Sequence, residues 1–248
     1  MTAPMFYAEP GSLAQASAGA VITLTGPEGR HAVRVRRMAP GEPVQLSDGS
    51  GVVAVGRVDA AEDDMLAVLI DALERPDSRG PRFVLVQALA KGGRDELAIE
   101  AATELGVDAV VPWAAERCVV QWRGDRAVRS HRKWESVVSA AAKQARRATL
   151  PVVEPLATSA QLADRLAGAR VVLLHEEATS AIGALDLDGL GDGDRVALVV
   201  GPEGGVSDQE RASLVAAGAD VVRLGPSVLR SSTAGPAALA VLSAWLRW

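Results

Sequence analysis

A glycine-rich turn follows one of the most apolar short runs of the chain. Residues 195–210 read RVALVVGPEGGVSDQE, which predicts a buried strand, a turn with three glycines, and the start of a helix. Glycine lets the backbone approach a ligand closely and adopt positive φ, and open α/β sheets bind small molecules at the carboxyl ends of their strands. The turn matches neither GxGxxG nor GxxxxGK[ST], so it predicts neither a dinucleotide fingerprint nor a P-loop. On these residues alone, a ligand loop and an ordinary tight turn are equally good interpretations.

Two further strand ends carry polar residues. Residues 221–235 read VVRLGPSVLRSSTAG, which places Arg230 and several hydroxyls just before the last helix, and residues 171–177 read VVLLHEE. Three strand ends of this kind can line one cleft. The alternatives are a loop histidine with satisfied hydrogen bonds for His175 and a surface ion pair for Arg230.

The elements that must position these residues alternate between strands and helices from residue 81 onward. This alternation predicts an α/β domain with a mostly parallel sheet. Ser207 and Glu210 form the sequence signature of a capping box at one helix start. The last helix is apolar on two sides, which favours contact with a second subunit. The expected strands are 83–89, 107–111, 171–174, 196–200 and 221–224, and the expected helices are 94–105, 127–149, 160–166, 208–217 and 234–245.

Residues 1–73 have a different pattern, with short β-branched runs separated by turn signals. The expected strands are 20–24, 43–47, 52–58 and 65–70, with Asp48-Gly49 suited to a hairpin. Four short strands in this length indicate a small barrel or sandwich. Polar residues with Pro and Gly follow, so we expect a linker at 74–82 and a second domain at 83–248.

The composition excludes several classes of protein. The 248 residues include one cysteine, Cys118, and three histidines, so neither a disulfide framework nor a metal site is expected. No apolar run is long enough to span a bilayer. Residues 1–10 lack the pattern of a signal peptide, which favours a cytoplasmic location.

The charge of the chain is unevenly distributed. The net charge of −5 argues against nucleic acid, but Arg30–Arg37 contains four arginines and no acid, and Arg117–Arg147 contains nine basic and two acidic residues. These stretches carry +4 and +7, against −16 for the remaining chain. Because polyanion binding depends on local potential, an RNA-binding surface and a solvated helix face both remain open.

Over nearly its whole length the chain resembles the RsmE family of 16S rRNA uridine N3-methyltransferases, members of the SPOUT superfamily. The most specific matches are the Gly201–Gly205 turn with Glu210, and the segment from Leu224-Gly225 through Leu229-Arg230 to Thr233-Ala234. Further matches occur in the same order along the family pattern: His31 with Val35, Arg37 and Gly41, then Asp48-Gly49, Lys91-Gly92, Thr103–Val107, and Gln144 with Arg147 and Pro151. Three positions depart from the pattern, because Met5, Ala101 and Ser232 stand where the family usually has Arg, Lys and Glu.

The resemblance implies a PUA-like N-terminal β-barrel that helps to hold RNA, a trefoil-knotted parallel sheet, and a homodimer acting on 16S rRNA in the small ribosomal subunit. It also implies S-adenosylmethionine as cofactor, without metal. The residues that would bind the cofactor are Leu174, His175, Glu176, Gly201, Pro202, Glu203, Gly204, Gly205, Leu224, Gly225, Val228, Leu229, Thr233 and Ala234.

Methylation of uridine N3 needs a base, or donors that stabilise the anion left when the N3 proton departs. Arg230 is the candidate for anion stabilisation and for orienting a base, and Glu104 and Glu203 are candidate bases. Glu104 could equally cap or form an ion pair within its own helix, and Glu203 could simply shape its loop. The alternatives are a SPOUT enzyme that methylates a ribose 2′-hydroxyl and a non-catalytic RNA-binding protein. The candidate RNA contacts are His31, Arg34, Arg37, Lys91, Arg94, Gln144 and Arg147.

Overall fold

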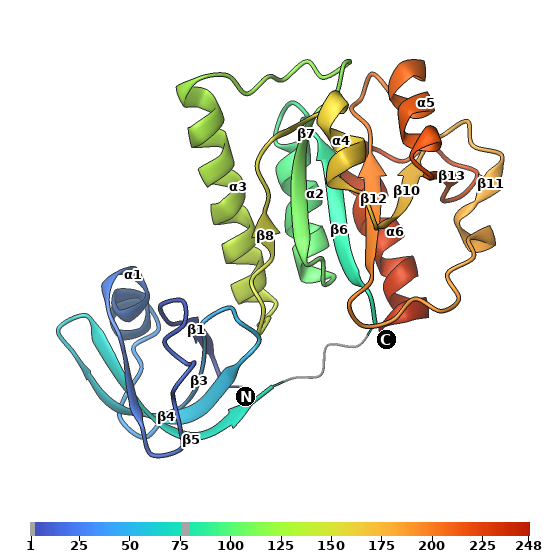
Figure 1. Cartoon of the computed structure of the whole chain (residues 1–248). Helices are drawn as coiled ribbons and strands as arrows, with labels where there is room; N and C mark the ends of the chain where they lie inside the picture. The colour runs from blue at the N-terminus through green and yellow to red at the C-terminus, as the bar shows by residue number, and fades with distance from the viewer. Residues whose placement is uncertain (1–2, 76–79) are drawn as a thin grey trace. The chain divides into compact units, whose positions relative to one another are not determined.

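The computed structural model describes residues 3–75 and 80–248, which form two compact units (Figure 1). The N-terminal unit comprises Met1–Asp77 together with Ala142–Leu150, and the C-terminal unit comprises Ser78–Ala141 and Pro151–Trp248. Part of the linker expected at 74–82, residues 76–79, lies outside the described residues.

The N-terminal unit is built on a curled five-stranded sheet in the order β1-β3-β4-β5-β2. The hairpin expected at Asp48-Gly49 is confirmed, because β3 and β4 pair antiparallel on either side of it. Two features were not expected: β1 pairs parallel to β3, and residues 26–35 form a short helix and a π-helical turn. The elements are β1 (Met5–Tyr7), β2 (Val21–Leu24), α1 (Gly26–Arg30), the π-helical turn (His31–Val35), β3 (Pro43–Ser47), β4 (Val53–Glu62) and β5 (Met65–Glu74).

A segment distant in sequence completes this unit. The helix expected at 127–149 is α3 (Asp125–Gln144), which ends before Arg146, a residue in the left-handed region with φ 53°. The chain then runs along the sheet, where the carbonyls of Arg147 and Ala148 each accept a hydrogen bond of 2.8 Å, from Tyr7 Oη and Ser47 Oγ. These bonds attach residues 142–150 to the N-terminal unit.

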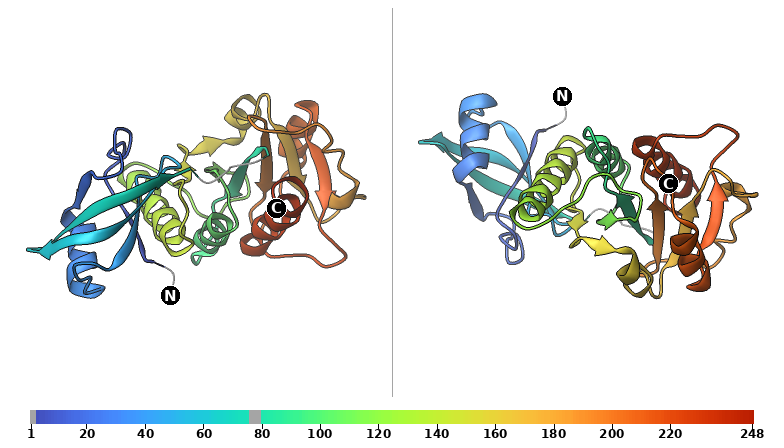
Figure 2. Two further views of the ribbon diagram at one scale, coloured as in Figure 1. Left: turned by 90° about the horizontal axis from the view of Figure 1, so that it is seen from below. Right: turned by 90° about the horizontal axis from the view of Figure 1, so that it is seen from above.

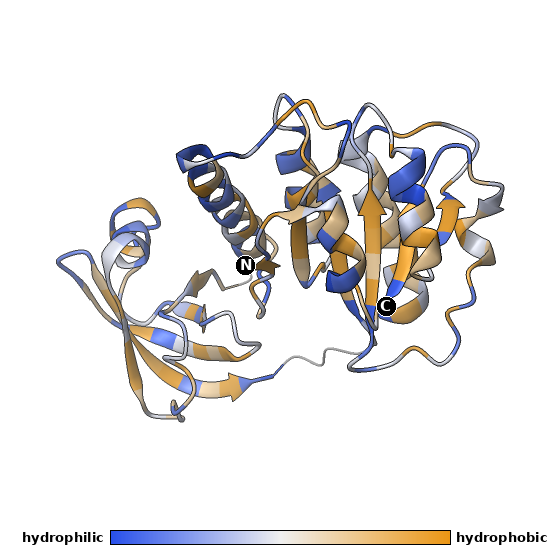
Figure 3. Cartoon of the chain, turned by 45° about the horizontal axis from the view of Figure 1, so that its top comes forward, coloured by the Kyte–Doolittle hydropathy of each residue, from blue (hydrophilic) through white to orange (hydrophobic). Residues whose placement is uncertain are grey.

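The C-terminal unit contains a parallel sheet of eight strands, which confirms the expected α/β class. The strand order is β11-β13-β10-β12-β6-β7-β8, with β9 also paired to β7. Its central strands are hydrophobic along their length (Figure 3), as strands covered on both faces must be. The strands are β6 (Arg82–Ala88), β7 (Ala109–Ala114), β8 (Val152–Val153), β9 (Ala157–Thr158), β10 (Arg170–Leu174), β11 (Ser180–Ala181), β12 (Arg195–Val200) and β13 (Asp220–Arg223).

Helices cover both faces of this sheet. Helices α2 (Arg94–Glu104) and α6 (Ser231–Leu246) pack side by side on one face, and α4 (Ser159–Arg165) and α5 (Asp208–Ala216) lie on the other (Figure 2). Arg247, just after α6, donates to the carbonyl of Gly106 at 2.9 Å and forms an ion pair with Asp108. These contacts fix the end of α6 to the connection between α2 and β7.

The described residues contain no helix long and apolar enough to cross a membrane. Nor do they bring together three or more His, Cys, Asp or Glu side chains in an arrangement that could hold a metal ion.

Candidate active site

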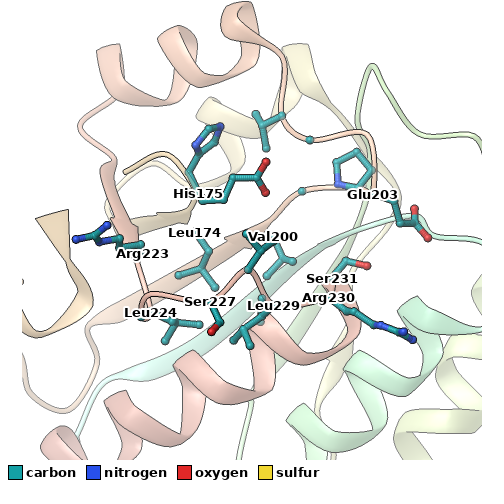
Figure 4. A pocket seen from close by; sticks show the side chains of 18 of the residues that line it. Leu174, His175, Val200, Glu203, Arg223, Leu224, Ser227, Leu229, Arg230 and Ser231 are labelled. Atoms are coloured by element: carbon teal, nitrogen blue, oxygen red, sulfur yellow. The ribbon is translucent and has the colours of Figure 1, made fainter. Parts of the chain in front are cut away.

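A cleft of about 430 Å³ lies at the carboxyl edge of the parallel sheet (Figure 4). Leu174, Val200 and Arg223 are the last residues of β10, β12 and β13, and all three line it. Because these strands are neighbours and parallel, the loops that follow them meet at one edge. The cleft therefore has a floor of strand ends, two of them apolar and one carrying Arg223, and walls made of three loops.

The glycine turn after β12 forms the first wall. Gly205 has φ +75°, and its amide donates to the Pro202 carbonyl at 2.9 Å, which closes the turn. Arg117 donates to the Gly204 carbonyl at 3.2 Å, and Arg94 pairs with Glu203 at 3.0 Å. Two arginines from outside the turn thus hold its conformation.

The capping box expected after this turn is confirmed. Glu210 accepts from the Ser207 amide at 2.9 Å, and the Ser207 hydroxyl accepts from the Glu210 amide at 3.3 Å. The buried Glu210 carboxylate also accepts from Ser159 Oγ at 2.5 Å and from the Glu116 amide at 2.7 Å. Burial acts to raise the pKa of Glu210, but these hydrogen bonds outweigh it and hold the pKa below its usual value. Glu210 therefore anchors the helix, and through it the turn, as a buried anion.

The segment between β13 and α6 forms the second wall. The Arg230 side chain is exposed and makes no hydrogen bond or ion pair with any described residue. The surface ion pair considered for it is therefore absent from the described part of the chain. Figure 4 shows Arg230 and Glu203 on one side of the cleft and Arg223 on the other. The Ser231 hydroxyl, also in the lining, is buried and has no hydrogen-bond partner among the described residues.

The loop after β10 forms the third wall. The His175 amide donates to the Val222 carbonyl at 2.9 Å, and its Nδ1 accepts from the Glu177 amide at 3.2 Å. Part of the His175 ring is therefore used to shape its own loop. Glu176, the next residue, is exposed at the cleft.

Most of the residues expected at a cofactor site come together here, although they derive from three separate segments. Gly204 and Thr233 are not part of the lining. Those that line the cleft are Leu174, His175, Glu176, Gly201, Pro202, Glu203, Gly205, Leu224, Gly225, Val228, Leu229 and Ala234.

The fold brings two of the three candidate catalytic residues to the cleft. Arg230 and Glu203 line the cleft, whereas Glu104 does not. Glu104 is exposed at the last residue of α2, and Arg94, the first residue of that helix, is the one that lines the cleft. Ten residues of helix place the two ends about 15 Å apart.

The candidate RNA contacts divide between the two units. Lys91 and Arg94 belong to the C-terminal unit, beside the cleft. Arg34 forms an ion pair with Asp64, and the His31 ring packs edge-on against Phe6 at 6.0 Å. The members in the N-terminal unit are His31, Arg34, Arg37, Gln144 and Arg147.

Several lining residues were not singled out from the sequence. Val200 is the last residue of the expected strand 196–200, and Arg223 lies within the expected strand 221–224, so their place next to an expected ligand loop was the available signal. The others are apolar or small residues with no motif of their own. The additional lining residues are Val200, Val206, Val222, Arg223, Pro226, Ser227 and Ser231.

In both basic stretches, some side chains form ion pairs with acidic residues and others form none. In the first, Arg30 and Arg34 both contact Asp64, which offsets part of the charge. In the second, several arginines are exposed along α3 and have no ion pair with a described residue: Arg126, Arg129 and Arg132. Lys133 and Lys143 of the same helix are paired with Glu96 and Glu28, so part of its charge is offset as well.

Comparison with known proteins agrees with the two-unit architecture. A family model described as an RNA methyltransferase domain matches residues 78–243, and one described as an RNA methyltransferase PUA domain matches residues 24–70. The chain is 44% identical over 245 residues to "Ribosomal RNA small subunit methyltransferase E" of Mycobacterium bovis, covering 96% of this chain and 90% of that protein.

Two solved structures have the same fold over almost all of the chain. The small subunit methyltransferase E of Neisseria gonorrhoeae, bound to S-adenosylmethionine, has a TM-score of 0.87 at 27% identity and covers 98% of both chains. A methyltransferase of Legionella pneumophila with bound S-adenosylmethionine has a TM-score of 0.87 at 26% identity, covering 99% of this chain and 98% of that one. The expected resemblance is thereby confirmed, and the chain belongs to the ribosomal RNA small subunit methyltransferase E family.

Proposed function

We propose that this protein transfers a methyl group from S-adenosylmethionine to N3 of one uridine of 16S rRNA in the small ribosomal subunit. The observation that supports this most directly is the cleft at the ends of β10, β12 and β13, formed by the loops expected to bind the cofactor. Two relatives with this fold are bound to S-adenosylmethionine.

The lining of the cleft fits such a cofactor chemically. Leu174, Val200 and Leu224 offer apolar surface for a flat adenine ring, and the buried Ser231 hydroxyl lacks a hydrogen-bond partner among the described residues. A buried polar atom of this kind is normally satisfied by a ligand or by water. Arg223 adds a cation at one side, suited to a carboxylate.

When bound, S-adenosylmethionine supplies an electrophilic methyl group on a positively charged sulfur. The residues of this chain must then make uridine N3 nucleophilic. Arg230 donates hydrogen bonds toward the acceptor base and stabilises the negative charge that spreads onto O2 and O4 when N3 loses its proton. Of the two candidate bases, only Glu203 lines the cleft, so its carboxylate, rather than that of Glu104, takes the N3 proton.

The PUA unit and the exposed arginines of α3 hold the RNA, because phosphate contacts fix position without reading bases. The protein acts in the cytoplasm as a homodimer with a knotted C-terminal sheet. Support for the dimer comes from α6 and the residues after it, where Trp245 is 52% exposed and Trp248 73%.

Nucleoside mass spectrometry of 16S rRNA tests this function. Small subunits from a strain lacking the gene are incubated with the protein and S-adenosylmethionine, and we expect 3-methyluridine to be restored. The appearance of a 2′-O-methylated nucleoside instead would show ribose methylation. If no methylated nucleoside forms and calorimetry detects no cofactor binding, the chain is a non-catalytic RNA-binding protein.

A further inference from the structure

The lining of the cleft contains three charged side chains that have no charge partner among the described residues. Arg223 and Arg230 are two of them, and both are exposed. The third is Glu176, which is also exposed and whose carboxylate accepts no hydrogen bond from the described part of the chain. The other carboxylate of the lining, Glu203, is paired with Arg94 at 3.0 Å. Glu176 is therefore the carboxylate that is available to a positive charge of a ligand.

The backbone of Glu176 is held in place by the loop that carries it. The His175 amide donates to the Val222 carbonyl at 2.9 Å, which extends the pairing of β10 with β13 by one residue. The Ala178 amide donates to the His175 carbonyl at 3.2 Å and closes a β-turn around Glu176. The Glu177 amide donates to His175 Nδ1 at 3.2 Å within the same turn. These bonds fix where the exposed carboxylate of Glu176 starts from, whether or not a ligand is bound.

The strand order places this turn in the middle of the cleft. Strand β10 lies between β13 and β12, and its last residue pairs with β13 on one side and with β12 on the other. Glu176 therefore follows the central strand of the three, whereas Arg223 ends β13. Figure 4 shows Arg223 on one side of the cleft and Arg230 on the other, with Leu174, the end of β10, between them. The charges along this edge are thus ordered as cation, carboxylate, cation.

S-adenosylmethionine has charges in a complementary order. Its α-carboxylate lies at one end, its positively charged sulfur lies in the middle, and the methyl on that sulfur points to the acceptor base, which becomes negative as its proton leaves. With the carboxylate at Arg223 and the base at Arg230, the sulfur lies beside Glu176. Opposite charges at such short range attract one another even where water is present.

We propose that Glu176 faces the sulfonium of bound S-adenosylmethionine and makes the cleft prefer this cofactor to its neutral product, S-adenosylhomocysteine. The inference rests on the proposed function, because it takes the cleft as the cofactor site and Arg230 as the residue beside the acceptor base. When the methyl passes to N3, the electron pair of the broken sulfur–carbon bond stays on sulfur and cancels its charge, while the N3 proton passes to Glu203. The product then loses its attraction to Glu176, which favours its release and replacement by a new cofactor. Glu176 is a specificity-determining residue and takes no part in bond formation.

Calorimetry with the two compounds tests the proposal. Glu176→Gln keeps the size of the side chain and removes its charge, and it should weaken binding of S-adenosylmethionine about fivefold and of S-adenosylhomocysteine less than about twofold. The preference of the wild type for S-adenosylmethionine should fall with added salt, as expected for an attraction between exposed charges. Glu177→Gln is the matched control, because Glu177 is exposed in the same turn but lies outside the lining. We expect this control to bind both compounds like the wild type.

The two compounds also separate the sulfonium from the α-ammonium, which both of them carry. Equal weakening of both by Glu176→Gln would place the carboxylate at the ammonium and overturn the proposal, and so would unchanged binding of both. In single-turnover assays at saturating S-adenosylmethionine, Glu176→Gln should react no more slowly than the wild type, because the charge that Glu176 stabilises is present before the transfer. A loss of about tenfold or more in this rate would instead mean that Glu176 acts in the transition state, against the proposal. If the preference is found but nucleoside mass spectrometry detects no 3-methyluridine, the proposed function fails while the recognition of the sulfonium stands.

Discussion

Arg94 and Glu203 form an ion pair of 3.0 Å that joins the loop after β6 to the glycine turn after β12. The two residues are 109 positions apart in sequence, and the parallel pairing of β6 with β12 brings them together. The pair therefore ties the glycine turn of the cleft to the first residue of α2.

Breaking this pair should affect function more than stability. The Arg94 and Glu203 side chains are 38% and 28% exposed, so Arg94→Ala should change the free energy of unfolding by less than about 1 kcal/mol. The turn loses one of its two arginine contacts, and we expect weaker binding of S-adenosylmethionine in calorimetry. Arg94→Lys, which keeps the charge, should bind S-adenosylmethionine more tightly than Arg94→Ala and less tightly than the wild type. A loss of stability above about 2 kcal/mol in urea unfolding would instead make the pair a structural contact.

Replacement of Arg230 should slow methyl transfer far more than it weakens cofactor binding. Its guanidinium has no partner among the described residues and lines the cleft, so its donors are available to the acceptor base. Arg230→Ala should lower kcat by about a hundredfold or more, as for removal of a donor that stabilises a developing anion. Arg230→Lys should recover only part of the rate, because it lacks the planar arrangement of donors. Equal losses in kcat and in the Kd of S-adenosylmethionine would contradict this role.

Glu210 should make stability depend on pH in the acid range. Its pKa in the folded protein lies below the usual value, so its contribution is fully present above the pKa of the unfolded chain, about 4.3. That contribution is lost as the pH falls through the lower, folded pKa. Glu210→Gln should cost about 1–3 kcal/mol at pH 7 and flatten the pH dependence of urea unfolding below about pH 5.

Asp208→Asn is the control for Glu210, because this carboxylate lies in the same helical turn with its side chain 91% exposed. We expect it to retain the pH dependence of the wild type. An equally steep acid dependence in Glu210→Gln would show that the buried carboxylate is not its source.

Tyr7 should make the folded protein less stable as the pH rises in the alkaline range. Burial raises the pKa of Tyr7 to about 12, so the folded state keeps the phenol protonated where the unfolded chain has lost the proton. The stability that this provides is complete below pH 10 and is lost between about pH 10 and 12.

Tyr7→Phe should remove this alkaline dependence and leave the Arg147 carbonyl without its 2.8 Å hydrogen bond. We expect a cost of about 1–3 kcal/mol at pH 7. Identical slopes of unfolding free energy between pH 10 and 11 in the variant and the wild type would contradict the assignment.

The sequence predicts best the features that depend on short-range chemistry. The capping box of Ser207 and Glu210 and the hairpin at Asp48-Gly49 rest on residues within a few positions of one another. The apolar strands before the three loops are equally local, because a strand buried on both faces must be hydrophobic along its length. The expected end of the helix at Thr149 was wrong, since the chain leaves α3 at Gln144 to run along a distant sheet.

The sequence by itself determined that three strand ends carry glycine, proline or polar residues, and that basic residues concentrate in two stretches. Only the tertiary structure decided that β10, β12 and β13 are neighbours, and that Glu203 faces Arg94 while Glu104 lies at the far end of α2. The physical reason is that hydrophobic pattern specifies what each strand buries, whereas strand order depends on long-range pairing that no local pattern encodes.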